Sequence, residues 1–159
     1  MPRPAAVIIL AAGAGTRMKS RLPKIMHPIG GMSMIGHALA AAKGLEPEHT
    51  VAVIRHERDT VAEHIGSFDP AVLLADQDEI PGTGRAVECG LEALAAEGAL
   101  PESGTVLVTL GDVPLITSDL LEQLHREHAE GGNAVTVLTT VLPDAGKYGR
   151  IVRDEGGAV

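Results

Sequence analysis

The chain has 159 residues, and 13 Lys and Arg against 21 Asp and Glu give it a formal charge of −8. This length suits one domain, and 45% hydrophobic with 21% charged residues is a globular composition, which excludes a disordered chain. The acidic balance argues against a nucleic-acid partner, because such a surface needs a basic face. The single Cys89 cannot form an internal disulfide, so we expect a cytoplasmic protein.

The first half of the chain alternates apolar runs with helical patterns. Residues 7–12 predict a buried strand rather than a signal-peptide core, because the run is short and continues into glycines and cations. A helix capped by Ser33 and ended by Gly44 follows, and then a second strand at 51–54. Thr60 opens a capping box for a short second helix.

The second half continues this alternation. We predict strands at 72–75, 106–110, 134–142 and 149–153, and helices at 83–96 and from Thr117 or Ser118 to Gly131. No apolar run approaches the ~20 residues of a membrane helix, so we expect no membrane insertion. The order predicts a three-layer α/β fold with a mostly parallel, Rossmann-like sheet, in which ligands bind beyond the carboxyl ends of the strands.

The loop after the first strand is rich in glycine and cations. Gly13 and Gly15 allow the backbone to approach a phosphate, and Arg17 and Lys24 add positive charge. The loop is neither a dinucleotide fingerprint, because Met18 occupies the third glycine position, nor a Walker A loop. The alternative is a tight strand exit with surface cations.

Two later loops also carry candidate ligand-binding groups. Gln77 offers an amide donor and acceptor for an imide edge such as that of uracil. Gly82, Thr83 and Gly84 would expose backbone donors at a helix N-terminus, although Thr83 alone is also a plausible N-cap. Asp112 follows a buried strand, where one carboxylate with substrate phosphates would hold Mg²⁺; the alternative is a turn cap before a proline.

The histidines and the cysteine suggest no further chemistry. His125 and His128 stand three residues apart and could bind a metal, but we expect both on a solvated helix face. Cys89 lies within an amphipathic helix without an adjacent cation, so we expect a structural role for it.

Taken in order, these motifs resemble the nucleotidyltransferase family, and within it the N-acetylglucosamine-1-phosphate uridyltransferases. The resemblance is carried by Leu-Ala-Ala-Gly-x-Gly-Thr-Arg-Met at 10–18, Pro-Lys-Ile-Met-His at 23–27, Gln77 with Gly-Thr-Gly at 82–84, Gly-Asp-Val-Pro-Leu at 111–115 and Tyr-Gly-Arg-Ile at 148–151. It implies a fold of the nucleotide-diphospho-sugar transferase type and transfer of UMP from UTP to N-acetylglucosamine 1-phosphate, with Mg²⁺ as cofactor.

The resemblance also implies roles for individual residues. Arg17 and Lys24 would serve catalysis at the phosphates, Asp112 would bind the metal, and Gly149 would contact the N-acetyl group of the sugar. The implied nucleotide and substrate contacts are Leu10, Ala11, Ala12, Gly13, Lys24, Gln77, Gly82, Thr83, Leu110, Gly111, Asp112 and Gly149.

Two features depart from the family pattern. Arg85 stands where the family usually has His, and the chain stops at Val159, whereas the family's domain continues and is followed by an acetyltransferase β-helix that forms a homotrimer. We therefore expect residues 1–159 to be the N-terminal portion of a nucleotidyltransferase domain, inactive or nearly so by itself.

Overall fold

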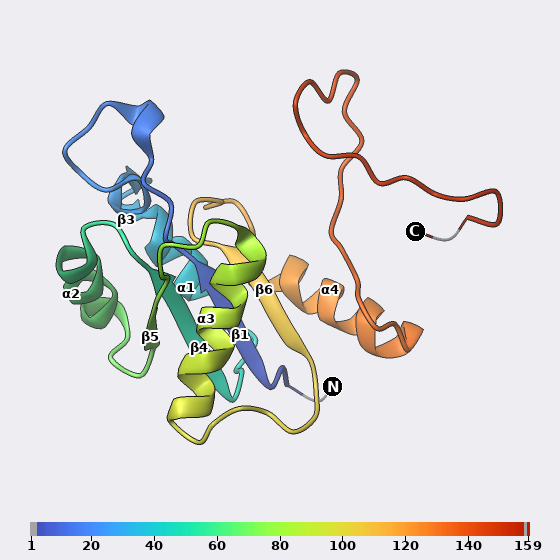
Figure 1. The fold of residues 1–159 in the computed structure, drawn as a ribbon, viewed down its shortest axis with the longest axis horizontal. Coiled ribbons are helices and arrows are strands. Elements are labelled where there is room, and N and C mark those ends of the chain that lie inside the picture. Colours follow the sequence, from blue (N-terminus) through green and yellow to red (C-terminus); the bar gives the residue numbers. More distant parts are fainter. Residues whose placement is uncertain (1–2, 158) are drawn as a thin grey trace.

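The fold is built on a four-stranded parallel sheet. A computed structural model describes residues 3–157 and 159 and orders the strands β5 (Leu73–Asp76), β4 (His49–Ile54), β1 (Ala6–Leu10) and β6 (Val106–Leu110) (Figure 1). All three pairings are parallel. The chain runs outward from β1 to β5 and returns to β6 on the other side of β1. The topological switch therefore lies between β1 and β6.

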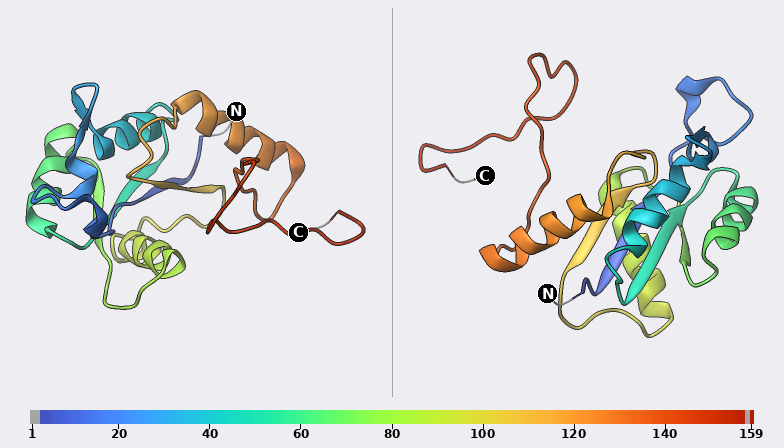
Figure 2. Two further views of the ribbon diagram at one scale, coloured as in Figure 1. Left: turned by 90° about the horizontal axis from the view of Figure 1, so that it is seen from above. Right: turned by 180° about the vertical axis from the view of Figure 1, so that it is seen from behind.

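Helices cover both faces of this sheet, as the sequence predicts. Helix α3 (Thr83–Ala96) packs on one face, and α1 (Met34–Lys43), α2 (Arg58–Phe68) and α4 (Ser118–Gly131) lie on the other (Figure 2). Alternate residues of β1 supply the two cores. Val7 and Ile9 belong to the core with α1, α2 and α4, whereas Ile8 packs toward α3, and all three are fully buried. The three-layer α/β prediction is confirmed.

Two short helical turns and a hairpin connect β1 to α1. They are η1 (Thr16–Met18), η2 (Lys24–Met26), β2 (Pro28–Ile29) and the antiparallel β3 (Met32–Ser33). Ser33 is the predicted N-cap of α1, and its hydroxyl accepts a hydrogen bond from the Gly36 amide at 3.1 Å. Thr117 caps α4 in the same way through the Leu120 amide.

The predicted capping box at Thr60 is wrong. Helix α2 begins earlier, at Arg58, and its N-cap is Glu57 in a left-handed conformation without a side-chain cap. The Arg58 guanidinium pairs with Asp76 at the end of β5, at 2.9 Å. This ion pair ties the start of α2 to the neighbouring strand, an effect that the local sequence does not show.

The predicted strands at 134–142 and 149–153 are also wrong, since neither segment forms a strand in the structure. Their β-branched composition favours a strand only where a partner strand covers them. Val135 and Val141 are instead 77% and 97% exposed. Another correction concerns His125, which is buried rather than solvated and packs beside α4 residues such as Leu121 in the cavity between α4 and β6.

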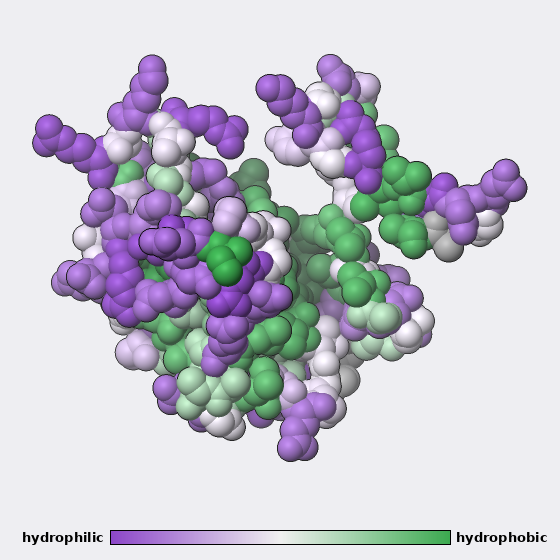
Figure 3. Space-filling view, viewed as in Figure 1, coloured by the Kyte–Doolittle hydropathy of each residue, from purple (hydrophilic) through white to green (hydrophobic). Residues whose placement is uncertain are grey.

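One face of the last strand is uncovered. Val106, Val108 and Leu110 of β6 are 36–42% exposed on the side of the sheet where α3 covers β1 and β4. Figure 3 shows apolar side chains gathered beside α3 on this side. None of the described helices has the length and apolarity that crossing a membrane would require.

Candidate functional site

A cavity of about 580 Å³ lies at the carboxyl ends of the strands. Loops that follow β1, β4, β5 and β6 all contribute to it, as expected for a parallel sheet. Predicted site residues that line it are Leu10, Ala11, Ala12, Gly13, Arg17, Lys24, Gln77, Gly82, Thr83, Leu110 and Asp112. Segments separated by up to a hundred residues thus meet at one edge of the sheet.

The loop after β1 is fixed at its base and turns sharply at Gly15. The amide of Ala11 donates to the Val53 carbonyl at 2.8 Å, which extends the β1–β4 pairing by one residue. Gly15 has a φ of +60°, and a Cβ at this position would lie 2.5 Å from the Cβ of Lys24. Only glycine therefore lets the loop pass so close to Lys24.

Lys24 and Asp112 meet across the cavity. The Lys24 ammonium contacts the Asp112 carboxylate, and each side chain is about one-third exposed. Gly111 precedes Asp112 and does not line the cavity. It is buried, and its amide donates to the Leu10 carbonyl at 2.9 Å, so it holds the ends of β1 and β6 together.

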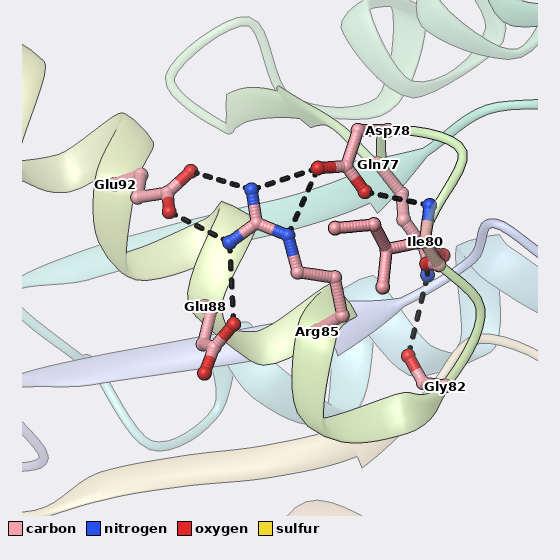
Figure 4. A network of polar contacts seen from close by, with 7 residues as sticks. All are labelled: Gln77, Asp78, Ile80, Gly82, Arg85, Glu88 and Glu92. Atoms are coloured by element: carbon pink, nitrogen blue, oxygen red, sulfur yellow. Dashed lines mark hydrogen bonds and ion pairs between the residues drawn. The ribbon is translucent and has the colours of Figure 1, made fainter.

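Gln77 organises the loop between β5 and α3 (Figure 4). Its side-chain amide donates to the carbonyls of Ile80 at 3.1 Å and Gly82 at 3.2 Å. Gly82 has a φ of +126° and is the N-cap of α3, so the reading of Thr83 as the N-cap is wrong. Gly82 and Thr83 instead border the cavity at the start of the helix.

Arg55 and His56 line the cavity and were missed by the sequence analysis. They follow β4 directly, so the rule that led to Gln77 and Asp112 would also have found them. Arg55 is half-buried, and the pKa of the Asp78 carboxyl in the loop after β5 is lowered mainly by hydrogen bonding to Arg85 and to a smaller extent by the charge of Arg55.

The cavity is cationic within an acidic chain. Arg17, Lys24 and Arg55 face a single carboxylate, Asp112, among the described lining residues. Excess positive charge at the carboxyl edge of a parallel sheet favours the binding of a ligand with several negative charges.

Two predicted site residues do not line the cavity, namely Gly111, which is buried, and Gly149. Gly149 belongs to the exposed segment after α4 and is not brought to the cavity. Among residues 3–157 and 159, no three His, Cys, Asp or Glu side chains cluster as a metal site. A divalent ion here would need ligands from bound phosphates besides the Asp112 carboxylate.

Comparison with known proteins gives relatives along nearly the whole chain. The bifunctional protein GlmU of Paenarthrobacter aurescens is 63% identical over 98% of this chain, and that of Streptomyces coelicolor is 52% identical over 99%. This chain is similar to their N-terminal regions and spans only 31% and 32% of their length.

Solved structures show the same fold. Rv0371c from Mycobacterium tuberculosis in complex with manganese has a TM-score of 0.60 at 17% identity, covering 81% of this chain and 61% of its own. A nucleotidyl transferase from Methanothermobacter thermautotrophicus has a TM-score of 0.61 at 19% identity, covering 76% of this chain and 56% of its own. The MobA-like NTP transferase domain model matches residues 7–145, and the chain therefore belongs to that family.

Proposed function

We propose that the chain is the N-terminal portion of a uridyltransferase domain, which transfers UMP from UTP to N-acetylglucosamine 1-phosphate in the synthesis of a cell-wall precursor. The products are UDP-N-acetylglucosamine and pyrophosphate. The observation that carries the proposal is the cationic cavity, which is bordered by Gln77, Gly82 and the Asp112 carboxylate. Similarity to the N-terminal regions of bifunctional GlmU proteins supports this choice of substrates.

Electrostatics dominates the reaction that we propose. The sugar phosphate is already an anionic nucleophile, so no general base is required. The main barrier is the approach of two anionic phosphates and the departure of pyrophosphate, in an in-line displacement at the α-phosphorus. Arg17 and Lys24 screen this charge, and Arg55 adds a third cation on the β4 side of the same cavity.

Base recognition falls to the loop after β5. Gln77 uses its amide group to hold the carbonyls of Ile80 and Gly82, and its Oε1 is then the atom that accepts from N3–H of uracil. Cytosine has an unprotonated N3, so the same acceptor disfavours it. Backbone amides at Gly82 and Thr83 are suited to the uracil carbonyl oxygens.

The metal that we propose is Mg²⁺ with Asp112 as its protein ligand. A single carboxylate plus substrate phosphates is a common Mg²⁺ environment, and Asp112 is the carboxylate that lines the described part of the cavity. When bound, the ion supplies charge neutralisation at the phosphate oxygens. Lys24 contacts this carboxylate and partly balances its charge. The role of Gly149 at the N-acetyl group remains part of the proposal.

Pyrophosphate release tests the function. A longer chain covering the whole domain of the GlmU relatives should release pyrophosphate from UTP only with N-acetylglucosamine 1-phosphate and Mg²⁺ present. CTP should be a poor donor because cytosine lacks N3–H, and GTP and dTTP are compared in the same assay. Preference for CTP or GTP would assign the chain to another nucleotidyltransferase specificity. Nucleotide binding without pyrophosphate release would reduce it to a binding module.

A further inference from the structure

Arg85 lies in the first turn of α3 but does not line the cavity. Its guanidinium turns outward and binds three carboxylates (Figure 4). Two nitrogens contact Asp78, at 3.0 and 2.9 Å. The other contacts reach Glu88 at 3.2 Å and Glu92 at 2.7 and 3.2 Å. Only 21% of the Arg85 side chain is exposed.

Two of these partners come from the helix itself, but Asp78 belongs to the loop that follows β5. The other oxygen of the Asp78 carboxylate accepts from the Ile80 amide at 3.0 Å. The Ile80 carbonyl in turn accepts from the side chain of Gln77 at 3.1 Å. A continuous chain of hydrogen bonds therefore runs from Glu92 through Arg85 and Asp78 to the amide that faces the cavity.

The charges support this connection. Hydrogen bonding to Arg85 lowers the pKa of the Asp78 carboxyl, which shows that the two charged groups interact favourably. The three carboxylates likewise raise the pKa of the Arg85 guanidinium, with Glu92 contributing most. The planar guanidinium matches this arrangement because it can bind two carboxylates through separate edges, whereas a lysine ammonium cannot.

We propose that Arg85 is a positioning residue that fixes the Gln77–Gly82 loop and thereby sets selectivity for the uracil base. The inference rests on the proposed function. Without Arg85, Asp78 loses its ion pair with α3, and ligand binding has to order this part of the loop. The free energy needed to order the loop weakens binding of the base. It does not weaken binding of the phosphates, which contact the loop after β1.

Affinity measurements on the 159-residue chain distinguish binding of the base from binding of the phosphates. Calorimetric titrations with Mg²⁺ present would use UTP, CTP and inorganic tripolyphosphate, which lacks a base. Arg85→Ala should weaken UTP binding about tenfold, reduce the preference for UTP over CTP, and leave tripolyphosphate affinity within about twofold. Arg85→Lys should recover part of the UTP affinity, because it keeps the charge but not the forked geometry.

Arg3→Ala is the matched control. It removes an exposed arginine that pairs with Glu48 at 3.4 Å, before β1 and thus at the opposite end of the strands. This variant should bind all three probes like the unmodified chain. The carboxylate partners of Arg85 are 41–66% exposed and stay hydrated without it, and Arg3 and its partner are both exposed, so neither alanine variant should melt at a markedly lower temperature.

The outcomes are distinguishable. Unchanged UTP affinity and selectivity in Arg85→Ala would overturn the positioning role alone. Equal losses for UTP and tripolyphosphate would also overturn it, because they would indicate a general structural effect. If the unmodified chain binds tripolyphosphate but shows no preference among nucleotides, the proposed uridine specificity fails and this inference fails with it.

Discussion

The two glycines of the loop after β1 should respond very differently to the same substitution. At Gly13, an added Cβ would meet no atom within 4 Å, and the backbone is not in the left-handed region. At Gly15, φ is +60° and the Cβ would lie 2.5 Å from the Cβ of Lys24 and 3.4 Å from its Cγ. Because the closest atom is a Cβ rather than a flexible side-chain end, Lys24 has to move as a whole.

These geometries give the expected magnitudes. A left-handed conformation costs a non-glycine residue about 1–2 kcal/mol, and relieving the contact with Lys24 should bring the total for Gly15→Ala to about 2–3 kcal/mol. In a chain of this size, that loss lowers the melting temperature by about 5–10 °C. Gly13→Ala should leave stability unchanged or raise it, by at most about 1 kcal/mol.

The assay combines thermal unfolding with titration of tripolyphosphate. Gly15→Ala should lower both the melting temperature and the affinity, the latter about tenfold, because Lys24 is displaced from the cavity. Gly13→Ala serves as the control for stability. Equal melting temperatures for the two variants would refute the reasoning, as would a destabilised Gly15→Ala protein that still binds tripolyphosphate normally.

Three further changes test other parts of the structure. Lys24→Ala should lower uridylyl transfer by about 10²-fold in a chain covering the whole domain, and near-normal turnover would remove Lys24 from the mechanism. Arg55→Ala should weaken tripolyphosphate binding about tenfold without lowering the melting temperature; unchanged affinity would show that this cation faces no phosphate. Burial lowers the pKa of His125, with repulsion from His128 adding to the effect, so the unfolded chain takes up a proton more readily. Stability in urea should therefore fall from pH 7 to pH 5, through the ordinary histidine pKa of about 6.5, and His125→Leu should reduce that fall; an unchanged pH dependence would contradict it.

Much of the fold was predictable because its signals are local. The first strand is a continuous apolar run that is buried on both faces, and the helix at 83–96 places Gly90 and Leu94 on one buried face. The failures depend on distant partners. Residues 134–142 have the composition of a strand, but no strand in the described part of the chain pairs with them, and His125 is buried by packing that a helical repeat does not reveal.

The site was predictable to the extent that a parallel sheet gathers its strand ends. That rule brought Gln77 and Asp112 to one cavity with the loop after β1. The same rule extends to the end of β4 and places Arg55 at this edge as well. The outward turn of Arg85 was beyond sequence reasoning, because three carboxylates from a loop and a helix determine it together.

The order of the four strands has a consequence for the evolution of specificity. Neighbouring strands are about 4.8 Å apart, so β5 and β6 are separated by three intervals, about 14 Å, which is comparable to an extended nucleoside triphosphate. In the proposed complex, the ends of different strands therefore contact different parts of the ligand. If the proposed function holds, exchanging the connection after β5 would alter the groups that contact the base, while Lys24 and Asp112 would stay in place after β1 and β6.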